Sequence, residues 1–288
     1  MMALTYRGLL ILPLLVVVSI PEGAQSTLAD SSSGDSSGSL HDRKLASTLM
    51  IGTVVTGSLL ESYYSWWHDA AKPFTFYTEN WLSKGRGIDK IGHLYGSYFF
   101  FHMSREIMLY GGHDESTADW WGLGLSFFHS LTIEIGDGVS PYGFDYQDLL
   151  FDMAGIGYGY LQTKDPFFRN FNLKFSYWSS QGLKSPANFT KDYDALTIWL
   201  SFNVHNLLPY SVKSYWPDFL QLAVGYGVDD RATKAEVAFA LDLNLEVFSI
   251  KNEELALLQK IGNMIHVPAP GIKFTESKKP RSYFFLMR

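Results

Sequence analysis

The sequence has 288 residues, enough to bury a substantial core in one large domain or two smaller ones. Its 23 lysine and arginine residues and 29 aspartate and glutamate residues give a net charge of −6, without the basic block that a nucleic acid partner requires. The sequence contains no cysteine, which excludes disulfides, thiolate metal sites, cysteine nucleophiles and a lipid-modified N-terminal cysteine.

Residues 1–26 are predicted to form a signal peptide. Arg7 provides a positive start, an apolar run follows it, and the small residues Ala24 and Ser26 surround a cleavage position. An uncleaved membrane anchor is the alternative interpretation. Residues 27–40 are rich in serine and glycine, and we expect a flexible tether there because the segment is too polar to pack.

Residues 41–165 are predicted to form a helical core, because four segments in this range have a long apolar character. These segments are 45–67, 91–110, 117–136 and 146–162. The first has no charged residue between Leu45 and Leu60, which is slightly short of the roughly 18 to 20 apolar residues of a membrane span. We therefore favour a buried core helix over a membrane span for this segment.

Residues 166–288 are predicted to be rich in β-strands and to pack on the helical core. Apolar residues alternate with others in four segments, which are 171–178, 194–204, 219–228 and 234–248. A short amphipathic helix is expected at 252–265, and residues 267–274 should run extended because each proline restricts the residue before it. The predicted fold class is α+β, with a four-helix apolar bundle followed by an antiparallel sheet of about four strands.

Acidic and histidine side chains recur at helical spacing in or beside the apolar segments. Asp89 and His93 are four residues apart, with Lys90 between them, and Asp148 and Asp152 have the same spacing. Residues four apart lie on one face of a helix, so the members of each pair can point at a common centre.

Glu134 and Asp137 form a third acidic pair, three residues apart at the end of an apolar segment. An ionised carboxylate inside an apolar bundle is costly unless a cation or hydrogen bonds compensate it, so Glu134 and Asp152 need partners such as Lys90, His93 or a metal ion. The predicted polar centre consists of Asp89, Lys90, His93, Glu134, Asp137, Asp148 and Asp152, with His93, Glu134 and Asp152 as candidate metal ligands.

Structural interpretations of the same residues remain open. Asp89 and Asp148 would also suit the N-terminal turns of helices, and the whole centre would also suit a buried network without chemistry. Three further histidines of the helical region, His102, His113 and His129, are interpreted as structural or solvent-facing. The turn between the third and fourth helices does not have the spacing of a calcium loop, and the signatures of nucleotide sites and common hydrolases are missing.

The motifs "DKIGH", "EIGDG" and "YGFDYQDLLFDMAG" resemble the YfiM-like family of predicted periplasmic lipoproteins, whose function is unknown. "SLLESYYSWW", "KDYDALTIWLSFNV" and "IHVPAPGIKF" extend the resemblance over about residues 45–275. The order of the acidic and histidine residues is also distantly similar to that of VanZ-like membrane proteins. The chain departs from the family in having no cysteine for a lipid, and in having Asp152 where the family pattern usually has asparagine. The resemblance implies a location and an architecture but no activity.

These observations predict an exported cell-envelope protein that is periplasmic and associated with the outer membrane. Aromatic residues make up 16% of the chain and charged residues 18%, which leaves a large apolar surface to cover. We expect a structural or lipid-facing accessory role with membrane lipid or envelope components as partners, and no nucleotide. The alternative is a metal-dependent hydrolase of a lipid or cell-wall phosphoester, in which His93 and the carboxylates hold a divalent metal as the cofactor.

Overall fold

The computed structural model describes residues 36–68, 72–77, 80–81, 85–178, 193–229 and 231–286. The predicted signal peptide and residues 27–35 of the predicted tether lie outside the described residues. Helix α3 begins at Ser36, inside the segment expected to form the tether.

The chain divides into two compact units. The first unit consists of Met1–Tyr77, Phe100–Asp145 and Lys251–Leu258, and the second of Thr78–Phe99, Tyr146–Ile250 and Gln259–Arg288. Each unit therefore combines segments that are distant in the sequence.

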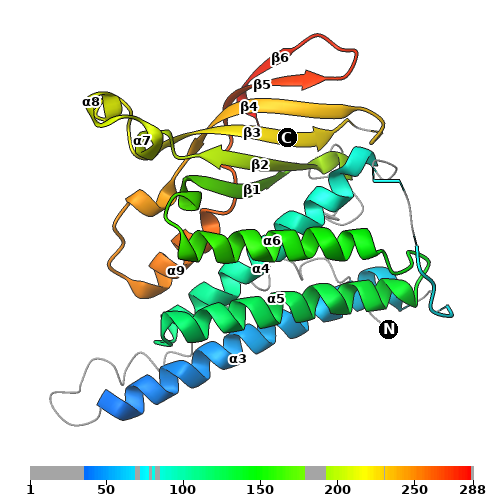
Figure 1. Ribbon diagram of the computed structural model, residues 1–288, viewed down its shortest axis with the longest axis vertical. Coiled ribbons are helices and arrows are strands. Elements are labelled where there is room, and N and C mark those ends of the chain that lie inside the picture. The colour runs from blue at the N-terminus through cyan, green and yellow to red at the C-terminus, as the bar shows by residue number, and fades with distance from the viewer. Residues whose placement is uncertain are drawn as a thin grey trace, which may run out of the picture. The chain divides into compact units, whose positions relative to one another are not determined.

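Four long helices occupy most of the described chain between residues 36 and 164 (Figure 1). They are α3 (Ser36–Ser62), which continues as a π-helical turn over Tyr63–Trp67, α4 (Ile88–Tyr110), α5 (Glu115–Gly138) and α6 (Tyr146–Lys164). All four predicted helical segments are confirmed, with ends that lie a few residues outside most of the predicted limits.

In the first unit, α3 lies along α5 (Figure 1). Ser58 Oγ is 2.8 Å from His129 Nε2, and the His129 ring stacks on Phe100 with 4.0 Å between ring centroids. A Cβ on Gly122 would lie 3.0 Å from the Phe101 ring, so a small residue is needed where α5 meets the second half of α4. His129 therefore has the structural role that the sequence predicts.

Leu40–Trp67 is the one helical stretch of the described residues that is long and apolar enough to cross a membrane, judged by length and composition alone. Only 28% of its most apolar window is buried, and Leu45, Leu49 and Leu60 are exposed. The helix is therefore not the buried core helix that the sequence favoured.

The described strands form one sheet with the order β1-β2-β3-β4-β5-β6, in which all neighbours are antiparallel (Figure 1). They are β1 (Phe171–Tyr177), β2 (Leu196–Phe202), β3 (Leu220–Val228), β4 (Ala235–Leu243), β5 (Ala269–Thr275) and β6 (Arg281–Leu286). The α+β class is confirmed, and the four predicted strands are present. The sheet has six strands, however, so the prediction of about four was wrong in number.

The sequence pattern missed both β5 and β6, and for β5 the reason is local. Pro270 and Gly271 interrupt the alternation in β5, and the pairing with β6 shifts register between Ala269 and Gly271. Proline and glycine are unfavourable inside strands and are tolerated near such irregularities. The extended course predicted for residues 267–274 is nevertheless confirmed over the part that β5 occupies.

Short helices connect these elements. They are η2 (Gly85–Gly87), η3 (Phe168–Asn170), η5 (Tyr193–Ala195), α7 (Val204–Leu207), α8 (Tyr210–Lys213), η6 (Leu245–Val247) and α9 (Glu253–Gly262). Helix α9 confirms the amphipathic helix predicted at 252–265.

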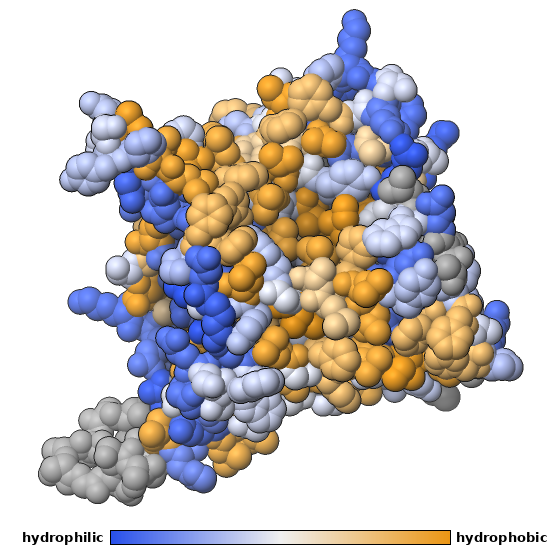
Figure 2. All heavy atoms as spheres, in the orientation of Figure 1, coloured by the Kyte–Doolittle hydropathy of each residue, from blue (hydrophilic) through white to orange (hydrophobic). Residues whose placement is uncertain are grey.

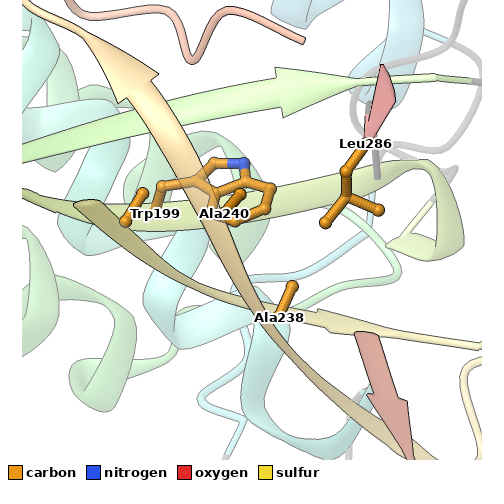
Figure 3. Packing of buried hydrophobic residues seen from close by; sticks show 5 residues of the cluster. Trp199, Ala238, Ala240 and Leu286 are labelled. Atoms are coloured by element: carbon orange, nitrogen blue, oxygen red, sulfur yellow. The ribbon is translucent and has the colours of Figure 1, made fainter. Parts of the chain in front are cut away.

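The inner face of the sheet, defined here as the face that carries Trp199, packs a large ring among small residues. Trp199 is fully buried beside Ala238, Ala240 and Leu286 (Figure 3). A Cβ on Gly225 would lie 2.6 Å from the Trp199 ring, so the neighbouring strand has no room for a side chain there. The size of one indole thus explains the small residues on this face.

The same inner face contains a buried ion pair. Lys174 Nζ lies 2.8 Å from Asp242 Oδ2, Ser201 Oγ donates to the same carboxylate oxygen at 2.6 Å, and His266 Nδ1 lies 3.2 Å from the other one. All four side chains are fully or almost fully buried. Charges are retained in such a place only when they are paired and hydrogen-bonded, as they are here.

Gly155 sets how closely α4 and α6 approach in the second unit, and this gives a test of the packing. A Cβ at this position would lie 2.0 Å from the Leu94 carbonyl oxygen and 2.4 Å from Ser97 Oγ. Gly155→Ala should therefore lower the free energy of unfolding in urea by about 1–3 kcal/mol, because backbone must move to admit the methyl group. Gly157→Ala is the matched control in α6, since nothing lies within 4 Å of its Cβ and alanine favours helix by about 0.5–1 kcal/mol. Equal effects of the two substitutions would contradict this packing.

Candidate functional site

A left-handed turn positions the start of α4. Gly85 and Gly87 have φ values of 51° and 83°, which side chains rarely adopt, and Arg86 between them has a φ of 57°. Arg86 is held there by an ion pair with Glu276 at 2.5 Å, while the Tyr226 hydroxyl donates to its carbonyl oxygen at 2.6 Å. The first residues of α4 are therefore tied to strand β3 and the β5–β6 turn within the second unit.

The polar site, a name used here for Asp89, Lys90 and His93 of α4 with Asp148 and Asp152 of α6, lies within the second unit. Lys90 is buried, with 4% of its surface exposed, and its ammonium lies 2.5 Å from Asp148 Oδ1 and 4.0 Å from Asp89 Oδ2. The structure thus brings together five of the seven residues that the sequence predicted as a centre.

His93 lies between the two carboxylates of α6. Its Nδ1 is 3.3 Å from Asp152 Oδ2, and its Nε2 is 3.8 Å from Asp148 Oδ2. Each helix presents its pair four residues apart, so both pairs face the same place, as predicted.

The surroundings shift the pKa values of two of these groups. Burial alone would lower the pKa of His93, but Asp152, Asp148 and Asp89 raise it well above 6.5. Burial raises the pKa of Asp148, despite the opposing effects of His93 and Lys90. The raised pKa favours the protonated form of His93, in which two cations, Lys90 and His93, face three carboxyl groups.

Two hydroxyl groups complete the polar site. The Tyr193 hydroxyl donates to Asp89 Oδ1 at 2.9 Å, and Ser97 Oγ donates to the Asp152 carbonyl oxygen at 2.8 Å. Tyr193 comes from η5, immediately before β2, and was not among the predicted site residues. The available signal was its place in "KDYDALTIWLSFNV", one of the segments that carry the family resemblance.

Glu134 and Asp137 belong to the first unit and support the turn after α5. Glu134 is 1% exposed and its Oε2 accepts a hydrogen bond from the backbone N–H of Asp145 at 3.1 Å. Asp137 Oδ1 accepts from Trp67 Nε1 at 2.7 Å. That Glu134 and Asp137 share one centre with the polar site stays a prediction.

Close packing explains why glycine occupies two positions of "EIGDG". A Cβ on Gly136 would lie 2.2 Å from the Trp67 ring, and one on Gly138 would lie 2.3 Å from the Phe74 ring. The Gly138 carbonyl oxygen also accepts from the backbone N–H of Thr75 at 2.8 Å. Part of the motif therefore serves the packing of Trp67, Phe74 and Thr75 against the end of α5.

The polar site has donor atoms for a metal ion. Asp89, His93 and Asp148 each offer one ligand atom, and these atoms lie within 4.8 Å of one another. Carboxylate oxygen and imidazole nitrogen suit zinc and other divalent transition metals. The charges oppose this use, however, because the Lys90 ammonium already contacts Asp148 and because a ligating His93 must lose its proton. The predicted ligand set of His93, Glu134 and Asp152 joins residues of both units and stays a prediction.

Residues 78–164 match the family described as "Predicted periplasmic lipoprotein (DUF2279)". This segment is similar to the DUF2279 family. The match confirms the resemblance to a YfiM-like family of unknown function, and the description of the DUF2279 family as periplasmic agrees with the predicted export. No curated protein and no solved structure has significant similarity to the chain.

The matched segment contains α4, α5 and α6 and therefore all seven residues of the predicted centre. It ends at Lys164, the last residue of α6, so the six-stranded sheet lies outside the matched segment. Tyr193 accordingly joins the polar site from outside the matched segment.

The Lys90–Asp148 pair can be tested by removing one charge and then both. Lys90→Met should lower the free energy of unfolding by about 3–5 kcal/mol, because it leaves Asp148 buried without its nearest cation. Lys90→Met combined with Asp148→Asn should cost clearly less than the sum of the two single substitutions. Glu253→Gln is the control, because its ion pair with Arg43 is exposed and its loss should cost about 1 kcal/mol or less. Additive effects of the two buried substitutions in urea denaturation would contradict the pairing.

Proposed function

We propose that this is an outer-membrane-associated envelope protein in which the polar site is a structural centre that joins α4 to α6. The exported, periplasmic character rests on the DUF2279 family description, and the membrane association and the structural role go beyond it. The observation that carries the structural role is the buried ammonium of Lys90, 2.5 Å from Asp148.

The balance of charge supports a structural role over a reactive one. Lys90 and His93 place two positive charges against three carboxyl groups from two helices. The attraction crosses from α4 to α6, so it stabilises the contact between these helices. Tyr193 adds a third element to the same network through Asp89.

The membrane association is supported by the apolar surface and by the composition of the chain. Large apolar side chains are exposed in both units, among them Trp120 at 72% and Phe239 at 51%. The DUF2279 family is described as a lipoprotein family, whose members are expected to be held at a membrane by a lipid, whereas this sequence has no cysteine to carry one. Direct contact between apolar side chains and the membrane would replace that anchor.

A second candidate function is a divalent-metal hydrolase acting on a lipid or cell-wall phosphoester. The proximity of ligand atoms from Asp89, His93 and Asp148 favours it. Elemental analysis after loading with zinc or manganese separates the candidates. The structural role predicts no stoichiometric metal, whereas one equivalent that disappears in His93→Gln would support the hydrolase.

Fractionation of bacteria that express the whole chain tests the proposed location. We expect the protein in the outer-membrane fraction at both low and high salt, because apolar contact is not screened by ions. Recovery in the soluble periplasmic fraction at both salt concentrations would show that membrane association is wrong. Release by high salt alone would contradict apolar contact, and retention in the cytoplasm would contradict export.

A further inference from the structure

The sheet in the second unit has opposite polarity on its two faces. Its inner face carries the fully buried Lys174 and Asp242. Its outer face consists of the residues that alternate with them on five strands, and none of these is charged or carries an amide. They are Phe171, Leu173, Phe175 and Tyr177 of β1, Leu196, Ile198, Leu200 and Phe202 of β2, Leu220, Leu222, Val224, Tyr226 and Val228 of β3, Ala235, Val237, Phe239, Leu241 and Leu243 of β4, and Pro270, Ile272 and Phe274 of β5.

The register of the strands makes this outer face continuous. One cross-strand row runs from Leu173 through Leu200, Val224 and Phe239 to Ile272. Directly opposed residues in such rows have neighbouring side chains, so the apolar surface has no polar gap between strands.

One end of the outer face is covered and the other is exposed. Near β1 the Tyr95 ring of α4 contacts Phe175, with 5.3 Å between ring centroids. The exposed patch, a name used here for Leu222, Val237, Phe239, Ile272 and Phe274 of β3–β5, consists of exposed residues. Figure 2 shows apolar side chains predominating over the region of the sheet on the side turned to the viewer.

A sheet with charged residues on its inner face and apolar residues on its outer face is unfavourable when the outer face contacts water. An antiparallel sheet with one face in water normally exposes polar side chains there and buries apolar ones. Strands that contact lipid show the reverse distribution, with apolar residues outward and polar residues inward. The strands β3 and β4 have nine residues each, which corresponds to about 30 Å, close to the thickness of the hydrocarbon layer.

The two ends of the strands carry residues that are typical of the membrane–water interface. The connection between β2 and β3 exposes Tyr210 at 95% and Tyr215 at 83%. In this antiparallel order the turn between β5 and β6 lies at the opposite end; it carries Lys278 and Lys279, and Arg281 follows as the first residue of β6. Tyrosine rings favour the headgroup level, and cations are attracted by anionic lipid headgroups.

We infer that the exposed patch on β3–β5 is the surface by which the protein contacts the acyl chains of a lipid bilayer. This inference rests on the proposed membrane association and specifies its contact surface. Lipid fits better than a second copy of the chain, because interface-type residues flank the patch at both strand ends and because the chain has no cysteine for the lipid that the family description implies.

Single-cysteine labelling tests the inference, since the chain has no other cysteine. Phe239→Cys and Phe274→Cys place a fluorophore in the exposed patch, where both native side chains are exposed and need no repacking. Lys279→Cys is the control at the strand end. Each full-length protein is mixed with vesicles of phosphatidylethanolamine and phosphatidylglycerol, some of which carry quenching groups on their acyl chains, and is then floated.

Labels at 239 and 274 should lose most of their fluorescence to the acyl-chain quencher and be protected from aqueous iodide, whereas the label at 279 should remain open to iodide. A protein that floats with vesicles without acyl-chain quenching at 239 and 274 would overturn this inference but leave membrane association intact. A protein that does not float at all would overturn both. Protection of both labels in the absence of vesicles, rising with protein concentration and without lipid quenching, would assign the patch to a second copy instead.

Discussion

The arrangement of α4 and α6 depends on one buried contact, the ion pair between Lys90 and Asp148. An ammonium with 4% exposure would be strongly destabilising without a carboxylate at 2.5 Å. The pair also fixes the position of its neighbours, because Asp148 faces His93, and His93 in turn faces Asp152. Gly155 lets the two helices come close enough for these contacts to form.

The sheet of the second unit contains a buried ion pair as well. Lys174 and Asp242 are paired inside the sheet, as Lys90 and Asp148 are paired between helices. The interior of this unit therefore contains charges that are paired with opposite charges, while its outer sheet face is apolar. With only 18% charged residues in the chain, these buried pairs leave few charges for a solvated surface.

Local periodicity predicted much of the fold and one part of the site. Apolar patterns identified all four long helices and strands β1–β4, and the spacing of four residues placed Asp89 with His93 and Asp148 with Asp152. Strand β5 was missed because Pro270 and Gly271 break the alternation, and β6 because its apolar residues at 284–286 are consecutive. The contact of Lys90 with Asp148 and the hydrogen bond from Tyr193 to Asp89 join segments that are distant in the sequence. Local residue spacing cannot predict such contacts. The burial of Glu134 was anticipated, whereas its hydrogen bond from the Asp145 backbone was not.

The ionisation of His93 is the most direct test of the central claim that the polar site is a compensated network of charges. Nuclear magnetic resonance titration can follow its ring protons, which are assigned by their loss in His93→Gln. The account predicts that the pKa of His93 in the folded protein lies above 6.5 and falls in Asp152→Asn. A pKa at or below 6.5, or one that Asp152→Asn leaves unchanged, would contradict the account, because burial would then outweigh the carboxylates and the network would lack its second cation.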